Sequence, residues 1–140
     1  MTIRTIIFLL VLTMPIIATE ELDGTFIWTQ IELPATDTAE AHAAVAFEYF
    51  FRYGSYGVPD NVEVLGVELV DGRLTVDVSE DIANYGGSAF ERALAAQLIK
   101  IAQELPKTDS FTLLIEGEAR PLAQGTEIVA YDLRGAGLHR

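Results

Sequence analysis

The feature that most constrains this chain is a β-hairpin whose register follows from residue types alone. Two alternating runs, 64–70 and 73–79, flank Asp71-Gly72, a favoured two-residue hairpin turn. With Val70 opposite Arg73, one face carries only apolar pairs: Leu69 with Leu74, Val67 with Val76, and Leu65 with Val78. A slip of one residue would turn the polar set inward, so the sequence predicts one register and one buried face.

Two amphipathic helices are predicted around this hairpin. Asp37 and Glu40 have capping-box spacing at the start of a helix that runs to about residue 52. Ser88 and Glu91 have the same spacing before a helix that ends near Pro106. The buried stripe of the second helix is predicted to comprise Phe90, Leu94, Gln97, Leu98, Ile101 and Leu105. A glutamine among apolar neighbours needs hydrogen-bond partners, so Gln97 is expected to bond nearby backbone.

The remaining segments predict strands and complete a fold class. Residues 25–33 are rich in β-branched and aromatic types and stop at Pro34, residues 111–115 alternate, and residues 127–131 are a possible last strand. The order is therefore β-α-β-β-α-β. A strand with one apolar face and a helix with one apolar stripe must each bury that surface against another element. The sequence thus predicts an α+β fold with two layers, in which two helices pack on one face of a small mixed sheet.

The N-terminus has the layout of a secretory signal peptide. Arg4 precedes a short apolar run over 6–18, and the small residue Ala18 comes before a polar stretch. A transmembrane helix needs about 20 apolar residues, so no stable membrane span is expected after cleavage. We predict a signal peptide over 1–18, a linker over 19–24, a domain over 25–133 and a flexible tail over 134–140. A retained N-terminal anchor is the alternative.

Charge and cysteine content exclude several classes of function. The net charge is −12, which repels nucleic acid and anionic lipid at long range. The chain has no cysteine, so it holds neither a thiolate metal site, nor a cysteine nucleophile, nor a cysteine-linked lipid. We therefore expect no nucleic-acid partner.

Residues that could carry chemistry do not form a convincing motif. Asp77, Ser79 and Asp81 are spaced like the start of a calcium loop, but later positions break the pattern. The stretch 85–88 could bind an anion at a helix start, although no lysine lies near it. His42 and His139 have no partner at ligand spacing. We predict no catalytic, cofactor-binding or metal-binding residues.

Several apolar and aromatic residues fall outside the predicted core. One helix residue points away from its buried stripe, four strand residues face away from the helices, and three tyrosines lie in glycine-rich loops. A contiguous patch of this kind marks a partner surface. The predicted interaction surface comprises Phe26, Trp28, Val64, Leu114, Ile99, Tyr53, Tyr56 and Tyr85.

The second half of the chain resembles the GerMN domain, the sporulation and spore germination domain of bacterial envelope proteins. The resemblance is carried by residues 65–69, 71–79, 87–88, 96–98, 104–106 and 111–117. It implies an extracytoplasmic domain that is not an enzyme and that takes part in protein assembly. This chain departs from the family in having no lipid-attachment cysteine and a single copy of the domain.

These observations predict an exported, periplasmic or secreted, non-enzymatic protein–protein interaction module of the bacterial cell envelope. No cofactor is expected, and the partner would be another envelope protein or a second copy of the chain. The alternative is a module that binds a small ligand or a cell-wall glycan fragment through the loops at 53–56 and 85–88.

Overall fold

The computed structural model describes residues 12–20, 25–54, 56–84 and 87–135. Its strands form a two-stranded ribbon, β1-β2, and a four-stranded sheet of order β3-β4-β5-β6. In chain order the elements are β1 (Leu12–Glu20), β2 (Phe26–Leu33), α1 (Ala39–Tyr53), β3 (Val64–Val70), β4 (Arg73–Val78), the 3₁₀ turn η1 (Glu80–Ala83), α2 (Ser88–Glu104), β5 (Ser110–Ile115) and β6 (Tyr131–Asp132).

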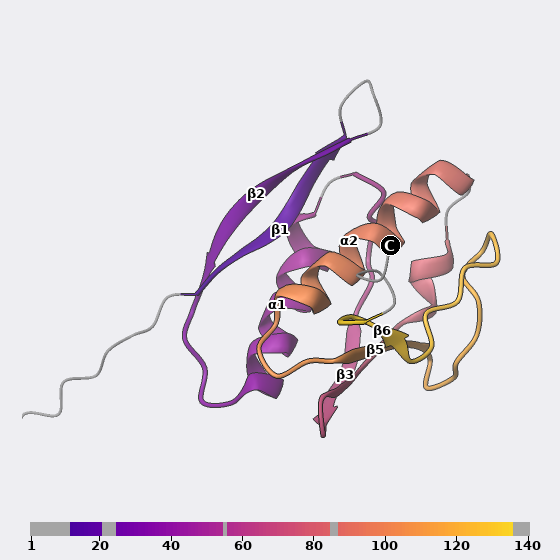
Figure 1. Cartoon of the computed structure of the whole chain (residues 1–140). Coiled ribbons are helices and arrows are strands. Elements are labelled where there is room, and N and C mark those ends of the chain that lie inside the picture. Colours follow the sequence, from indigo (N-terminus) through magenta and orange to yellow (C-terminus); the bar gives the residue numbers. More distant parts are fainter. Residues whose placement is uncertain (1–11, 21–24, 55, 85–86, 136–140) are drawn as a thin grey trace, which may run out of the picture.

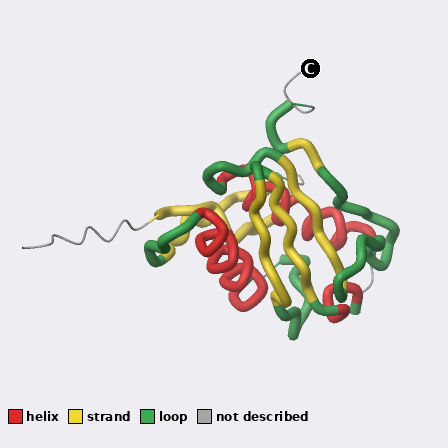
Figure 2. Tube along the Cα trace, turned by 90° about the horizontal axis from the view of Figure 1, so that it is seen from below, coloured by secondary structure: helices red, strands yellow, loops and turns green. Residues whose placement is uncertain are grey.

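The two helices form a layer between the ribbon and the four-stranded sheet (Figure 1). Both helices contact β1, and α1 also contacts β3. The strands of the larger sheet lie side by side in Figure 2, and β4 pairs parallel with β5 while the other pairs are antiparallel. The helices and the larger sheet fill the core with fully buried side chains that include Phe47, Phe50, Leu98, Ile101 and Phe111. The predicted α+β class with a mixed sheet is confirmed.

The placement of residues 25–33 in that mixed sheet is wrong. Strand β2 pairs antiparallel with β1 and with no strand of the larger sheet. The reason is that residues 12–20, which the sequence assigns mostly to a signal peptide, supply a main-chain partner of their own. Met14, Ile16 and Ala18 are 3%, 0% and 0% exposed, so β1 covers the side of the helices that the larger sheet leaves open.

A β-bulge in the ribbon changes which side chains of β2 face the helices. The register shifts between Pro15 and Ile17, so β1 carries one residue more than its partner, and side-chain alternation is reset there. Leu33 is buried and Ile31 packs against the core on one side of the shift, whereas Phe26 and Trp28 are half-buried on the other. Simple alternation of exposed and buried side chains therefore does not hold along the whole of β2.

The hairpin at the centre of the sequence forms much as its residues predict. Asp71 and Gly72 have positive φ values of 50° and 78°, as a tight two-residue turn requires. The predicted register holds from Val70 opposite Arg73 down to Gly66 opposite Asp77. It then shifts by one residue, which leaves Leu65 unpaired and 48% exposed.

Helix starts differ from the predicted capping boxes. Thr38, one residue after Asp37, is the N-cap of α1, and its side chain accepts a hydrogen bond from the Ala41 N–H at 3.0 Å. The Glu40 carboxylate instead accepts a bond from the Leu69 N–H on β3 at 2.9 Å. Helix α2 follows Gly87 with no side-chain cap. Phe90, predicted to be buried, is 43% exposed because it lies at the first turn, outside the packed stripe.

The C-terminal segment folds back beside β5 mostly without forming a strand. Only Tyr131 and Asp132 make the short strand β6, so the predicted strand over 127–131 has the wrong bounds. The Leu113 N–H donates to the Ile128 carbonyl at 2.9 Å, and the Arg134 Nε donates to the Thr108 carbonyl at 3.1 Å. The predicted tail thus begins with an anchored residue, and residues 136–140 lie outside the described part of the chain.

Strand β1 contains residues 12–18 of the predicted signal peptide. The structure is that of the whole chain, so cleavage after Ala18 stays a prediction. Within the described residues, no helix combines the length and apolar character that a membrane span needs.

Candidate functional site

Four aromatic rings from three chain segments meet at one end of the ribbon and form what we call the aromatic cluster, Phe26, Trp28, Tyr56 and Phe90. The ring centroids of Phe26 and Trp28, on β2, are 6.0 Å apart. The Tyr56 ring, from the loop after α1, lies 6.5 Å from Phe26 and 5.4 Å from Phe90 at the start of α2. These separations are in the range of attractive aromatic pairs.

The backbone around Tyr56 is held against α2 by two features. Gly57 has a φ of 76°, and a Cβ atom there would lie 2.9 Å from the Phe90 carbonyl oxygen, so only glycine fits this close approach. Gln97 donates from Nε2 to the Tyr56 carbonyl at 2.7 Å and to the Ala93 carbonyl at 3.0 Å. The prediction that Gln97 bonds nearby backbone is confirmed, and its role is to fix the loop that presents Tyr56.

The aromatic cluster offers a surface for binding. Phe26, Trp28 and Tyr56 are half-buried, and Phe90 is 43% exposed. Rigid aromatic side chains of this kind give large contact areas at small entropic cost and are enriched in protein interfaces. The arrangement can hold a partner, and no acid–base pair among the described residues adjoins it.

The other predicted surface residues do not join this cluster. Leu114 lies on the face of β5 that points away from the helices, among polar neighbours such as Thr112. Val64 and Ile99 pack against the core, so their predicted outward orientation is wrong. Tyr53 is 54% exposed, and its ring centroid lies 4.6 Å from that of Tyr49 in the last turns of α1, with the two rings tilted. Tyr85 lies outside the described residues.

Two polar residues of the failed calcium pattern, Asp77 and Ser79, bond to backbone groups in separate places. The Asp77 carboxylate accepts from the Gly117 N–H at 2.8 Å. The Ser79 hydroxyl accepts from the Glu63 N–H at 2.9 Å and donates to the Asp81 carboxylate at 3.2 Å. No group of three or more metal-ligating side chains occurs in the part of the chain that the structure describes. Asp77 and Ser79 therefore fasten chain segments that are far apart in sequence.

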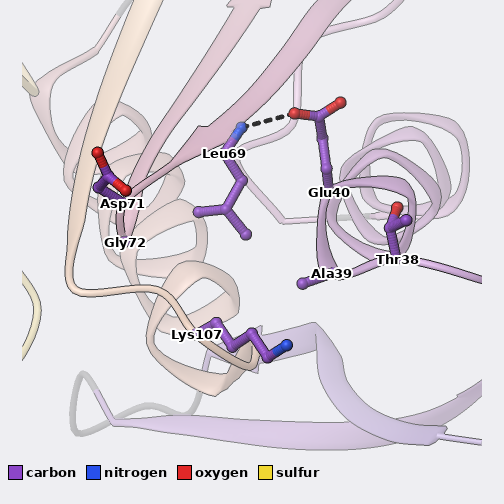
Figure 3. Close-up of a pocket in the computed structure, with 7 residues that line it drawn as sticks. All are labelled: Thr38, Ala39, Glu40, Leu69, Asp71, Gly72 and Lys107. Carbon is purple, nitrogen blue, oxygen red and sulfur yellow. Dashed lines mark hydrogen bonds between the residues drawn. The ribbon is translucent and has the colours of Figure 1, made fainter.

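Strand β3 and the N-terminus of α1 enclose an open depression of about 470 Å³. Figure 3 shows Glu40 reaching the Leu69 backbone on one side, with Lys107 extending below it. The lining residues are Thr38, Ala39, Glu40, Leu69, Asp71, Gly72 and Lys107. The Glu40 carboxylate is already bonded to β3. The other ionisable groups that line the depression are the Asp71 carboxylate and the Lys107 amine. That set provides no nucleophile paired with a base.

The sequence reasoning missed the burial of Glu91. Although it lies in the first turn of α2, Glu91 is only 3% exposed. Its carboxylate accepts hydrogen bonds from the Gln124 N–H at 2.7 Å, the Thr126 N–H at 3.1 Å and the Thr126 hydroxyl at 2.7 Å. A signal was present, because Glu91 is three residues before Leu94 and so shares the buried face of the helix.

His42 is buried on α1 without apparent chemistry. It is 2% exposed, and its Nδ1 atom has no hydrogen-bond partner among the described residues. Burial removes water from the charged imidazolium and therefore lowers the pKa of His42 below its ordinary value of 6.5. The side chain is a neutral part of the core at neutral pH.

This lowered pKa predicts a pH dependence of folding stability. Because the unfolded chain takes up the proton first, the free energy of unfolding should decrease as the pH falls below 6.5, by about 1.4 kcal/mol for each unit by which the pKa is lowered. Urea unfolding between about pH 5.5 and 7.5 measures this. The slope should flatten in His42→Gln and persist in the control His139→Gln. Equal slopes in the two variants would contradict the assignment.

Comparison with known families and structures gives consistent matches. A family model described as Germane, sporulation and spore germination, matches residues 23–121. The first GerMN domain of the sporulation protein GerM from Bacillus subtilis is similar at 19% identity with a TM-score of 0.66, over 86% of this chain and 96% of that one. Comparison with curated proteins gives no match.

Two further solved structures share the fold. The tandem GerMN domains of GerM from Bacillus subtilis match at 18% identity with a TM-score of 0.67, over 86% of this chain and 45% of that one. A protein from Clostridium perfringens, described as a lipoprotein on uncertain grounds, matches at 14% identity with a TM-score of 0.59, over 85% of this chain and 82% of that one. At these identities the structures establish the fold alone.

Proposed function

The chain belongs to the Germane family of sporulation and spore germination domains, and from this premise we propose that it is an exported, non-enzymatic protein–protein interaction module of the bacterial cell envelope. The observation that carries the proposal is the aromatic cluster. Four rings from β2, the loop after α1 and the first turn of α2 gather at the surface, where they can bury area against a partner.

The distribution of polar side chains supports a binding role over a catalytic one. Asp77, Ser79 and Glu91 are engaged with backbone groups of distant segments, so each has a structural function. A general acid or base must instead point at a site where a substrate can lie. The aromatic cluster has no such group beside it in the described residues, but it has the residue types that dominate binding energy in protein interfaces.

An envelope location is supported by the signal-like N-terminus and by the relatives. The apolar run over 6–18 and the small residue Ala18 at its end have signal-peptide layout. The structural neighbours include a sporulation protein and a protein described as a lipoprotein. Separation of producing cells into cytoplasmic and envelope fractions tests the location, and a wholly cytoplasmic protein would contradict it.

The aromatic cluster predicts which substitution abolishes association. Phe90→Ser should weaken binding to an envelope partner about tenfold or more, because the exposed ring supplies apolar contact area to the interface. Since Phe90 is 43% exposed, its loss should leave the melting temperature within a few degrees of the wild type. Partners are identified by cross-linking in the producing cell and mass spectrometry, and their affinity is then measured by titration with purified protein.

The matched control is Val129→Ser. Val129 is 51% exposed and lies beside β5, because its neighbours Ile128 and Ala130 bond to Leu113 and Thr112. It should bind the partner as tightly as the wild type. Equal binding by Phe90→Ser, Val129→Ser and the wild type would remove the cluster from the interface.

A second candidate function is binding of a small ligand or a cell-wall glycan fragment. It is favoured by one observation, the contact between the Tyr56 ring and Phe90, which brings the loop after α1 to the start of α2. Aromatic faces beside such loops suit sugar rings. Titration of the same Phe90→Ser and Val129→Ser variants with peptidoglycan fragments separates the two candidates.

A further inference from the structure

Strand β1 covers an apolar surface with a segment that cleavage on export would remove. Its side chains Met14, Ile16 and Ala18 are 3%, 0% and 0% exposed, and both helices contact the strand. Figure 1 shows β1 on the side of the ribbon nearer to the helices. Residues 12–18 nevertheless belong to the stretch with signal-peptide layout. Cleavage after Ala18 would therefore leave the rest of the domain with an uncovered apolar surface.

The surface that β1 covers, which we call the β1 site, combines two kinds of contact. After cleavage, β2 would lose its main-chain partner along residues 28–33. The core would lose the side chains of Met14 and Ile16, which belong to its cluster of buried residues. A row of free backbone groups beside an apolar surface is the arrangement that accepts a donated strand in β-strand addition. The vacated β1 site would thus suit an extended segment of another chain.

We propose that the exported domain, once cleaved, binds an extended segment of another envelope protein in the β1 site. This rests on the proposed function, because it names how the interaction module holds one of its partners. The donated strand pairs antiparallel with β2, as β1 does. It places apolar side chains where Met14, Ile16 and Ala18 lie, the last of them small. In the uncleaved chain the N-terminal strand occupies the site that the partner takes later.

The occupant is a different protein and not a second copy of this chain. Every cleaved copy would lack the same residues 12–18, so no copy could supply the missing strand to another. Of the other described strands, β3, β4, β5 and β6 already form the larger sheet, and β2 is part of the site itself. The chain has a net charge of −12, so a partner of opposite charge is favoured. The occupant is therefore an apolar strand that also carries basic residues.

The exposed face of the ribbon shows where one basic residue of the occupant fits. Thr13 is exposed and lies opposite Glu32, which is exposed as well. Opposite charges at facing positions of an antiparallel pair attract each other. A lysine at the place of Thr13 would therefore strengthen binding, whereas a lysine at the place of Ile16 would be buried among apolar side chains at a large cost. The same side chain should have opposite effects at these two positions.

Strand exchange in the full chain tests the β1 site. A protease recognition sequence inserted between residues 23 and 24 allows the folded protein to be cut between β1 and β2. The melting temperature of the cut protein should fall on dilution, because β1 is then held by binding alone. A fluorescent peptide of residues 12–20 should replace the cut strand, and fluorescence anisotropy measures its affinity.

Two variants of that peptide, each with one new lysine, form a matched pair. The Thr13→Lys peptide should bind at least as tightly as the unmodified peptide. The Ile16→Lys peptide should bind at least about tenfold more weakly. Because the protein is the same in both titrations, a folding defect cannot produce the difference. Equal affinities of the two variants, or no exchange of the unmodified peptide, would overturn the proposal.

The occupant itself is identified on the exported protein. A photo-reactive residue in place of Gln30, which is exposed and lies opposite Pro15, should cross-link to the segment in the β1 site. Mass spectrometry should then give a segment of another protein with apolar residues at three alternate positions. A synthetic peptide of that segment should compete with the peptide of residues 12–20 for the cut chain. Recovery of residues 12–18 of this chain, or a segment that does not compete, would contradict strand donation.

These outcomes are distinguishable from failure of the proposed function. A retained N-terminus would overturn strand donation alone, because the aromatic cluster would still be free to bind a partner. Failed strand exchange together with weaker partner binding by Phe90→Ser would likewise leave the proposed function supported. A wholly cytoplasmic protein would instead contradict export, and with it both proposals.

Discussion

A chain that begins at Thr19 is expected to melt about 10–25 °C below the full chain. Such a chain lacks most of β1, including Met14 and Ile16, which are 3% and 0% exposed. Full burial of a Met or Ile side chain stabilises a fold by about 1.5–3 kcal/mol. Removing both, and leaving β2 without its strand partner, takes a large part of the 5–15 kcal/mol that typically separates folded from unfolded states.

The control for this truncation is a chain that begins at Leu12. It keeps the whole of β1 (Leu12–Glu20) and should melt close to the full chain. Differential scanning calorimetry of the three proteins makes the comparison. If the chains that begin at Thr19 and Leu12 melt at the same temperature, β1 contributes nothing measurable to the fold.

This result also bears on export. Cleavage after Ala18 would remove the strand that covers α1 and α2, whereas a retained N-terminus keeps it. The intact mass of the protein recovered from the envelope fraction distinguishes the two. If the exported protein begins at Thr19, its domain should show the lowered melting temperature of the truncated chain.

The variant Glu91→Gln is expected to lower the free energy of unfolding by about 2–4 kcal/mol. The buried carboxylate accepts three hydrogen bonds from Gln124 and Thr126. An amide of the same shape keeps one acceptor oxygen but presents N–H donors where the loop also presents N–H donors. At least one buried donor would lose its partner, and that loss is costly.

Urea unfolding measures the effect, and Glu104→Gln is the matched control. Glu104 lies at the other end of the same helix and forms only an exposed pair with Lys100 at 3.0 Å, so its loss should cost less than about 0.5 kcal/mol. Hydrogen exchange should also show faster exchange of the Gln124 and Thr126 amides in Glu91→Gln. Equal stability of the two variants would contradict the role assigned to Glu91.

Local residue patterns predicted the centre of the fold well. The Asp71-Gly72 turn and the alternation beside it define both the hairpin and its register from Gly66 onward. The alternation of apolar and polar residues in β3 does not indicate the bulge that exposes Leu65. A bulge depends on how the strand packs against other elements, and the sequence of the hairpin does not contain that information.

Long-range pairing explains what the sequence did not predict. An apolar stretch such as 12–18 suits both a signal peptide and a buried strand. Only the packing of Met14 and Ile16 against the helices reveals the strand. The aromatic cluster arises in the same way, since Phe26, Tyr56 and Phe90 are far apart in the chain. The sequence pattern identified Phe26, Trp28 and Tyr56 as surface candidates but did not show which of these side chains contact one another.

The contact between Glu40 and the Leu69 N–H has a consequence for how this acidic protein behaves when crowded. It occupies a donor on one outer strand of the larger sheet, while the two-residue β6 and the bonds to Ile128 and Thr112 shield the other side. Stacking of sheets edge to edge is the route by which folded β proteins grow into fibrils. These contacts leave fewer free backbone groups at the two edges of the larger sheet, so edge-to-edge growth from this sheet is disfavoured.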